Sequence, residues 1–172
     1  NKALEVIEAK YLFGLAPRQI EVVIHPQSVI HSMVQYQDAS VVAQLGTPDM
    51  RVPIAYGLSW PERVASGAAT LDFMSLAALT FETPDPTRFP GLQLAWETLN
   101  GPTGSTAVLN AANEVAVESF LSGRIRFDQI HSLNVDMIQS CQIPDVTTLD
   151  DVLGLDVQTR VQATAWVAAH GN

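Results

Sequence analysis

The first five residues bring together three side chains that could bind an anionic substrate and a metal ion. Asn1, Lys2 and Glu5 supply an amide, an ammonium and a carboxylate at the start of a predicted helix. Asn1 and Glu5 are four residues apart and therefore share a helix face, and Lys2 is three residues from Glu5. The free N–H groups of a helix N-terminus, together with an ammonium, could bind a phosphate. Spacing alone favours the alternative, an ordinary capped helix with solvated side chains.

Two histidines, His25 and His31, stand at the ends of the run His-Pro-Gln-Ser-Val-Ile-His. If both belong to strands they point in different directions, so we do not expect them to share a metal ion. A histidine near a strand end is more often a hydrogen-bonded structural residue than a catalyst, with a pH-dependent role as the alternative. Glu5 alone does not make a metal site either, although Mg²⁺ and Mn²⁺ prefer carboxylate oxygens.

The spacing of apolar residues in this part of the chain is typical of helices in some segments and of strands in others. Apolar spacing predicts a helix over 2–13, ended by Gly14, and a short helix over 50–59. β-branched and alternating segments predict three strands of an antiparallel sheet, at 21–25, 30–37 and 40–45. The first helix would cover one face of this sheet, which is an α+β arrangement.

The second part of the chain has a different pattern. Residues 61–89 contain several prolines and no sustained period, which indicates a long connector with one short strand at 79–81. Beyond it, apolar spacing predicts four helices, at 90–99, 105–122, 127–141 and after a cap at Thr147 or Thr148, which together suggest a small bundle. We therefore predict three regions, 1–60, 61–89 and 90–172.

The composition excludes several classes of protein. Of the 172 residues, 47% are hydrophobic and 16% are charged, which predicts a buried core rather than disorder. The net charge of −9 and the lack of a basic run argue against a nucleic-acid-binding protein. No apolar stretch is long enough to predict a membrane span. The single cysteine, Cys141, excludes an internal disulfide framework.

The chain starts on a predicted helix, without an initiator methionine or a signal sequence. We therefore expect it to be the later part of a longer polypeptide, located in the cytoplasm, or in a plastid if a leader lies upstream. It contains no glycine-rich dinucleotide fingerprint, so the main binding domain of any nucleotide cofactor would lie elsewhere. Without any resemblance, the leading interpretation is an acidic module that binds a partner.

Nearly the whole chain resembles the 1-deoxy-D-xylulose 5-phosphate reductoisomerase family. The similar segments are Asn1–Glu5, Ile24–Val34, Ala43–Ala55, Leu71–Phe73 and Leu109–Glu114. The resemblance implies the later part of such an enzyme. Residues 1–60 would end a mixed α/β catalytic domain with antiparallel strands, which carries the metal, substrate and dimer contacts. A long connector and a C-terminal four-helix bundle would follow, and the N-terminal NADPH-binding domain would be missing.

The resemblance also implies roles for individual residues. In the family, the glutamate of an Asn-Lys-x-x-Glu motif and two further carboxylates hold a divalent cation, Mg²⁺ or Mn²⁺. Only the motif glutamate, Glu5, is present in this chain. Asn1, Lys2 and Glu5 would bind the substrate, the first two chiefly at its phosphate end, and Lys2 and Glu5 would be catalytic. The remaining site residues would be His31 at the substrate, and Pro48 and Met50 near the nicotinamide and the mobile active-site flap.

The implied reaction is the NADPH-dependent conversion of 1-deoxy-D-xylulose 5-phosphate to 2-C-methyl-D-erythritol 4-phosphate in non-mevalonate isoprenoid biosynthesis. It proceeds by metal-assisted rearrangement and hydride transfer. The implied partners are a phosphorylated sugar, the missing N-terminal half of the enzyme and a second copy in a homodimer, with no nucleic acid or membrane. This segment alone would be inactive, because it holds one carboxylate of three. An isolated acidic interaction module and an inactive fragment are the alternatives.

Overall fold

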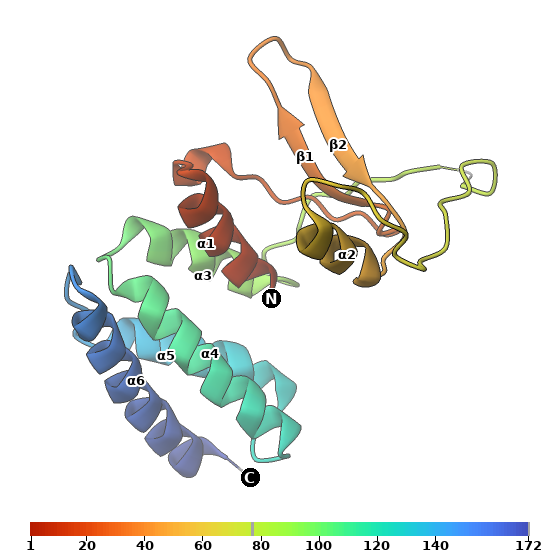
Figure 1. Cartoon of the computed structure of the whole chain (residues 1–172). Coiled ribbons are helices and arrows are strands. Elements are labelled where there is room, and N and C mark those ends of the chain that lie inside the picture. Colours follow the sequence, from red (N-terminus) through yellow and green to blue (C-terminus); the bar gives the residue numbers. More distant parts are fainter. Residues whose placement is uncertain (77, 172) are drawn as a thin grey trace. The chain divides into compact units, whose positions relative to one another are not determined.

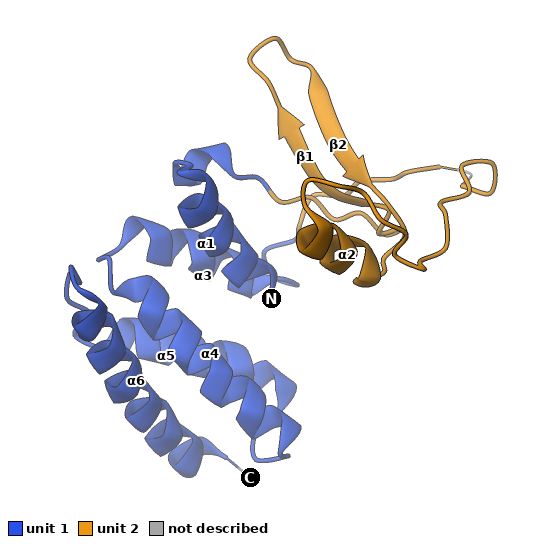
Figure 2. Cartoon of the chain, viewed as in Figure 1, with its two compact units in different colours: residues 1–21, 85–172 blue, residues 22–84 orange. Residues whose placement is uncertain are grey.

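The computed structural model describes residues 1–76 and 78–171 (Figure 1). Residues 77 and 172, which belong to the predicted connector and bundle, lie outside the described residues. The chain divides into two compact units (Figure 2): unit 1 comprises residues 1–21 and 85–172, and unit 2 comprises residues 22–84. The division into domains at 1–60, 61–89 and 90–172 stays a prediction about the whole protein.

Unit 1 consists of helices and the turns that join them. Its elements are α1 (Lys2–Phe13), the 3₁₀ turn η1 (Pro17–Gln19), α3 (Pro90–Asn100), α4 (Ser105–Leu121), α5 (Phe127–Ser140) and α6 (Leu149–His170). Gly14 ends α1 with a φ of 65°, a left-handed conformation that glycine adopts without a steric penalty. Thr148 caps α6, because its hydroxyl accepts a hydrogen bond of 3.2 Å from the backbone N–H of Asp151.

The core of unit 1 lies where α4 packs against α5 and α6. The buried side chains of this core are Val108, Ala112, Ala116, Ile125, Leu133, Met137, Leu155, Ala163 and Val167. Helix α1 packs against α3, and the indole N–H of Trp96 donates to the carbonyl of Pro17 in η1 at 3.3 Å. The helix that we expected to cover the strands therefore belongs to unit 1, where it contacts another helix.

Unit 2 contains a hairpin, one helix and long irregular segments. Strands β1 (Ile30–Gln35) and β2 (Val41–Leu45) form a two-stranded antiparallel sheet, and α2 spans Arg51–Ser59. The hairpin turn places Ala39 at a φ of 66°. In the same turn the carboxylate of Asp38 accepts hydrogen bonds from the backbone N–H and the hydroxyl of Ser40.

The α+β class and the helices were predicted correctly, and the bounds of α1 to α5 differ from the predicted ones by at most one residue. The predicted strands at 21–25 and 79–81 are wrong. In their place a single isolated bridge pairs Ile24 with Glu82. A turn that closes with a hydrogen bond from the N–H of Ser28 to the carbonyl of His25 follows this bridge.

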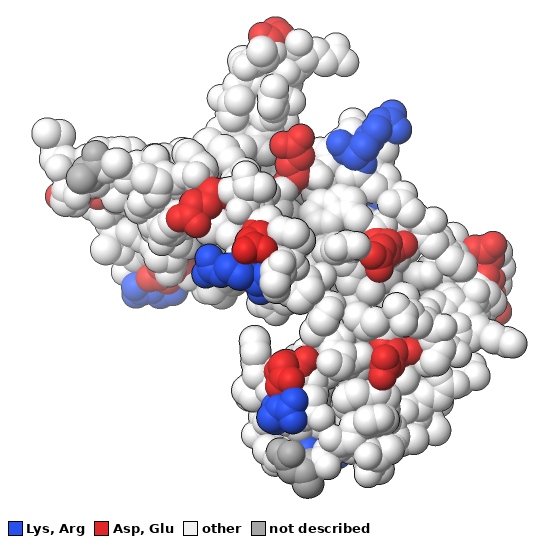
Figure 3. Space-filling view, turned by 180° about the vertical axis from the view of Figure 1, so that it is seen from behind, with Lys and Arg blue, Asp and Glu red and all other residues white. Residues whose placement is uncertain are grey.

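Charged side chains are sparse on the surface. On the face shown in Figure 3, acidic and basic side chains lie singly or in small groups among uncharged residues. Among the described residues, no helix is both long enough and apolar enough to cross a bilayer.

Candidate functional site

The N-terminus of α1 positions the first group of predicted site residues. Asn1 precedes the helix, and its carbonyl accepts the hydrogen bond from the N–H of Glu5 at 3.0 Å, which closes the first turn. The amide of Asn1 makes no capping hydrogen bond to α1. The side chain of Asn1 can therefore bind a ligand without uncapping the helix.

Lys2 and Glu5 are brought together one helical turn apart. The ammonium of Lys2 donates a hydrogen bond to Oε2 of Glu5, and the two side chains are 56% and 50% exposed. An exposed ion pair of this kind contributes little to stability, because water screens both charges. The pair can therefore open at low cost, which frees the carboxylate for a cation and the ammonium for a phosphate.

The donor chemistry of Glu5 fits one position in the ligand shell of a hard divalent cation. Mg²⁺ and Mn²⁺ prefer oxygen ligands, and Mg²⁺ requires nearly octahedral geometry. Within residues 1–76 and 78–171, however, no three His, Cys, Asp or Glu side chains lie close enough to hold a metal ion. Glu5 could therefore serve as one ligand only, with the other oxygens supplied from outside the described residues.

His31 lies at an irregularity in the hairpin of unit 2. Ile30 pairs with Leu45 and Ser32 pairs with Gln44, so the register shifts by one residue at His31. Such bulges leave one residue unpaired and redirect its side chain, and they are frequent beside active sites. A Cβ atom placed on Gly46 would lie 3.9 Å from Cε1 of His31, so the exposed imidazole lies beside the loop that follows β2.

Pro48 and Met50 belong to this same loop, Gly46–Met50. Its first residue donates a backbone hydrogen bond of 3.0 Å to the carbonyl of Val29, next to β1. Met50 precedes α2, and 71% of its surface is exposed. The structure therefore brings His31 together with the loop of Pro48 and Met50 in unit 2, whereas Asn1, Lys2 and Glu5 belong to unit 1.

An ion pair fixes the end of the loop at the start of α2. The guanidinium of Arg51 donates to both carboxylate oxygens of Asp49, at 2.6 Å from Nη2 and 3.0 Å from Nε. The backbone N–H of Arg51 donates to the same carboxylate at 2.9 Å. These side-chain and backbone hydrogen bonds lower the pKa of Asp49 from 3.8 to about 2. Asp49 is therefore ionised at neutral pH and acts here as a structural anion.

Sequence reasoning missed the partners of His25 and Gln27. Both side chains hydrogen-bond to Thr80, more than 50 residues later in the chain. No local pattern could have indicated these contacts, because residues 61–89 carry no periodicity from which a partner could be inferred. The structure gives His25 a hydrogen-bonded role, which was the alternative favoured for a histidine near a strand end.

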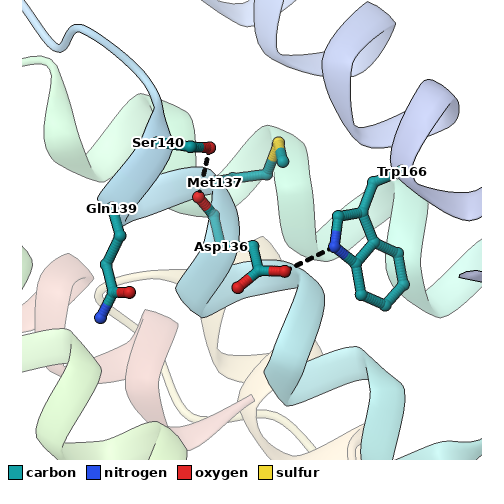
Figure 4. Close-up of a pocket in the computed structure, with 5 residues that line it drawn as sticks. All are labelled: Asp136, Met137, Gln139, Ser140 and Trp166. Atoms are coloured by element: carbon teal, nitrogen blue, oxygen red, sulfur yellow. Dashed lines mark hydrogen bonds between the residues drawn. The ribbon is translucent and has the colours of Figure 1, made fainter.

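A shallow pocket in unit 1 lies between α5 and α6 (Figure 4). Its lining residues are Asp136, Met137, Gln139, Ser140 and Trp166. The indole N–H of Trp166 donates to the carboxylate of Asp136 at 2.6 Å, and the hydroxyl of Ser140 donates to the carbonyl of Asp136. These polar groups already bond to one another, and none of the predicted site residues lines the pocket. It is therefore not the candidate site.

Comparison with known families gives a match over most of the chain. Residues 45–162 match the sequence model of the DXP reductoisomerase C-terminal domain. The 1-deoxy-D-xylulose 5-phosphate reductoisomerase of Nitrosomonas europaea is 56% identical over 170 residues, which are 99% of this chain and 41% of that protein. The enzyme of the same name from Ralstonia pickettii is 54% identical over 98% of this chain and 42% of its own length. The chain thus spans about two-fifths of these relatives.

Solved structures give the same result. A DOX-P reductoisomerase in complex with NADPH, fosmidomycin and magnesium matches with a TM-score of 0.89 and 44% identity, over 98% of this chain and 43% of that one. The Zymomonas mobilis reductoisomerase in complex with NADPH matches with a TM-score of 0.87 and 45% identity, over 97% of this chain and 44% of that one.

Proposed function

The chain belongs to the DXP reductoisomerase family, and on this basis we propose that it forms the later part of an NADPH-dependent reductoisomerase. The proposed enzyme converts 1-deoxy-D-xylulose 5-phosphate to 2-C-methyl-D-erythritol 4-phosphate for non-mevalonate isoprenoid biosynthesis. The observation that carries this proposal is the match to a reductoisomerase whose structure holds NADPH, fosmidomycin and magnesium, with a TM-score of 0.89 over 98% of the chain.

In this proposal Glu5 is the metal ligand of the chain, and Asn1 and Lys2 bind the substrate phosphate. A bound Mg²⁺ or Mn²⁺ would act as a Lewis acid that polarises a substrate carbonyl. Glu5 would neutralise part of the charge of the cation and would fix the position of one oxygen ligand. The ammonium of Lys2 pairs with the phosphate as a charged hydrogen-bond donor, so that binding energy remote from the reacting carbons helps to orient them.

For unit 2, we propose that His31 contacts the substrate and that Pro48 and Met50 contact the cofactor. The exposed imidazole of His31 can hydrogen-bond to substrate oxygens, since each ring nitrogen can donate or accept. The exposed thioether of Met50 and the ring of Pro48 offer apolar surfaces for the nicotinamide of NADPH. We propose that the remaining contacts to NADPH come from the N-terminal half of the enzyme.

The exposed apolar side chains support the proposed protein partners. On α6 they recur every four residues, at Leu149, Leu153, Val157 and Val161, and we propose that they contact the rest of the same enzyme. On the hairpin they are Met33, Val34, Tyr36, Val41 and Val42, and we propose that the face with the cross-strand pair Val34 and Val42 contacts a second copy in a homodimer. A two-stranded hairpin is rarely stable in water by itself, so this surface requires a partner. We place this dimer in the cytoplasm.

Turnover of the full-length protein tests the proposal. We expect oxidation of NADPH by 1-deoxy-D-xylulose 5-phosphate to require Mg²⁺ or Mn²⁺. Glu5→Gln should lower kcat/KM by at least about 100-fold, because it removes a metal ligand, and the loss of a residue that only orients a ligand already costs about 10- to 100-fold. Glu8→Gln, an exposed glutamate of the same helix, is the matched control and should change kcat/KM less than about twofold.

Two results would contradict the proposal. Metal-dependent turnover that survives Glu5→Gln would remove Glu5 from the metal site, although the reaction itself would stand. A full-length protein without turnover would favour the acidic interaction module. The chain by itself should show no turnover, because it supplies only one of the expected carboxylate ligands.

A further inference from the structure

Two side chains of the turn before β1 bind the same distant residue of unit 2. Oε1 of Gln27 accepts a hydrogen bond from the backbone N–H of Thr80 at 3.0 Å, and Nε2 of Gln27 donates to the hydroxyl of Thr80 at 2.9 Å. The ring nitrogen Nδ1 of His25 lies 2.8 Å from the carbonyl of Thr80. Because a carbonyl only accepts hydrogen bonds, Nδ1 is the donor. The side chains of His25 and Gln27 therefore satisfy both backbone groups and the hydroxyl of Thr80.

Neighbouring contacts extend this attachment along the chain. Ile24 and Glu82 exchange two backbone hydrogen bonds of 2.9 Å, and the ring of His25 stacks on Phe81 with 5.0 Å between ring centroids. The segment Thr80–Glu82 is therefore joined to the segment Ile24–Gln27 by both main-chain and side-chain interactions.

A second attachment lies at the candidate cofactor loop. The hydroxyl of Thr47 donates to the carbonyl of Ala69 at 3.1 Å. The residue before Thr47 is Gly46, and its backbone N–H donates to the carbonyl of Val29. Val29 directly follows the turn whose side chains bind Thr80. Ala69 thus holds the loop that carries Pro48 and Met50, and Thr80 holds the turn that leads to His31.

We propose that His25, Gln27 and Thr47 are positioning residues. Their hydrogen bonds to Thr80 and to Ala69, which we call the strap, hold the loop Gly46–Met50 in place for the nicotinamide cofactor. Val29 is the only buried hydrophobic residue in the described part of unit 2, so apolar packing alone does not fix this loop. The hydrogen bonds of the strap supply the missing restraint. The role in cofactor binding rests on the proposed function.

Variants at Gln27 and Thr80 of the full-length protein test the strap. In Gln27→Ala, hydrogen exchange at the backbone N–H of Thr80 should accelerate at least about tenfold, because its acceptor is lost. The Kd for NADPH, measured by fluorescence, should rise at least about fivefold, because two hydrogen bonds to Thr80 are lost and one alone corresponds to about that factor. The KM for the phosphorylated substrate should change less than about twofold, which separates positioning of the loop from general loosening.

Thr80→Val removes the hydroxyl and keeps the shape of the side chain, so it tests the strap even if Gln27→Ala does not fold. Thr80→Val should raise the Kd for NADPH. Thr80→Ser, which keeps the hydroxyl, should have the Kd of the wild-type protein. Ser75→Ala is the matched control. Its hydroxyl donates to a nearby carbonyl, that of Asp72, at 3.0 Å, and its loss should leave the Kd for NADPH unchanged.

The proposal is overturned if exchange at Thr80 accelerates while the Kd for NADPH stays the same. It is also overturned if Ser75→Ala raises the Kd for NADPH as much as Gln27→Ala does, or if the KM for the substrate rises together with the Kd for NADPH. A wild-type protein that binds no NADPH would instead refute the proposed function and the cofactor role with it. Exchange at Thr80 would still show whether the attachment itself forms.

Discussion

The two units of the chain are stabilised by different interactions. In unit 1 the aliphatic side chains of α4, α5 and α6 are buried against one another, and Leu133 has no exposed surface. In unit 2, Val29 is the one buried hydrophobic residue among those the structure describes, and hydrogen bonds connect its turns and loops. Unit 1 therefore has a hydrophobic core of its own. The described part of unit 2 buries too few apolar side chains to form one, so its stability requires further contacts.

This difference matches the chemistry proposed for each region. A loop held by hydrogen bonds can shift by small amounts when a ligand binds, whereas a close-packed core resists such shifts. His31, Pro48 and Met50 lie in the weakly packed unit. Glu5 and Lys2 lie on the first turn of α1, whose buried residues Val6 and Ile7 anchor it within unit 1. The proposed metal ligand is thus on the more rigid element.

The largest expected effect is on the core of unit 1. Leu133→Ala should lower the free energy of unfolding of unit 1 by about 3 kcal/mol, because it leaves a cavity among close-packed side chains. Urea unfolding followed by helical circular dichroism measures this loss. Leu121→Ala in α4, where the side chain is 77% exposed, is the control and should change the free energy by less than about 0.5 kcal/mol. Equal losses in the two variants would mean that unit 1 has no tightly packed core.

A smaller effect is expected in unit 2, at the ion pair between Asp49 and Arg51. Carbon-detected NMR should give a titration midpoint for Asp49 of about 2, and Arg51→Gln should move it toward 3.8. Since the pKa is lower in the folded than in the unfolded chain, the stabilisation by Asp49 is fully present above about pH 4. It is lost as the pH falls toward 2.

Asp38 provides the internal control for this titration. Its pKa is lowered by hydrogen bonds from Ser40, chiefly from the hydroxyl, and Arg51 makes no contribution to it. Its midpoint should therefore stay below the ordinary value in the Arg51→Gln protein. A shift of both aspartates would show that Arg51 acts on the fold of unit 2 as a whole rather than on the start of α2.

Prediction from sequence succeeded where structure depends on local pattern. The helices follow from apolar spacing and from end signals such as Gly14 and Thr148, and the hairpin follows from alternation around Asp38. The strand predicted at 21–25 failed, because a β-branched segment forms a strand only where a partner lies alongside, and here one bridge at Ile24 is all that forms.

The candidate site could be predicted only in part. The ion pair of Lys2 and Glu5 is compatible with helical spacing, and the roles of Asn1, Lys2, Glu5, His31, Pro48 and Met50 come from the family resemblance and remain predictions. The bulge at His31 and the attachment of Thr80 depend on contacts between segments distant in sequence. Periodicity carries no information about such contacts.

The central claim is that Glu5 is one ligand of a divalent cation whose other protein ligands lie outside this chain. Mn²⁺ binding, measured by the loss of the free-ion electron paramagnetic resonance signal, tests it most directly. Full-length protein should bind one Mn²⁺, Glu5→Gln should bind at least about tenfold more weakly, and Glu8→Gln should bind as wild type does. This chain alone should bind none. Tight Mn²⁺ binding by the chain alone, or unchanged affinity in Glu5→Gln, would contradict the claim.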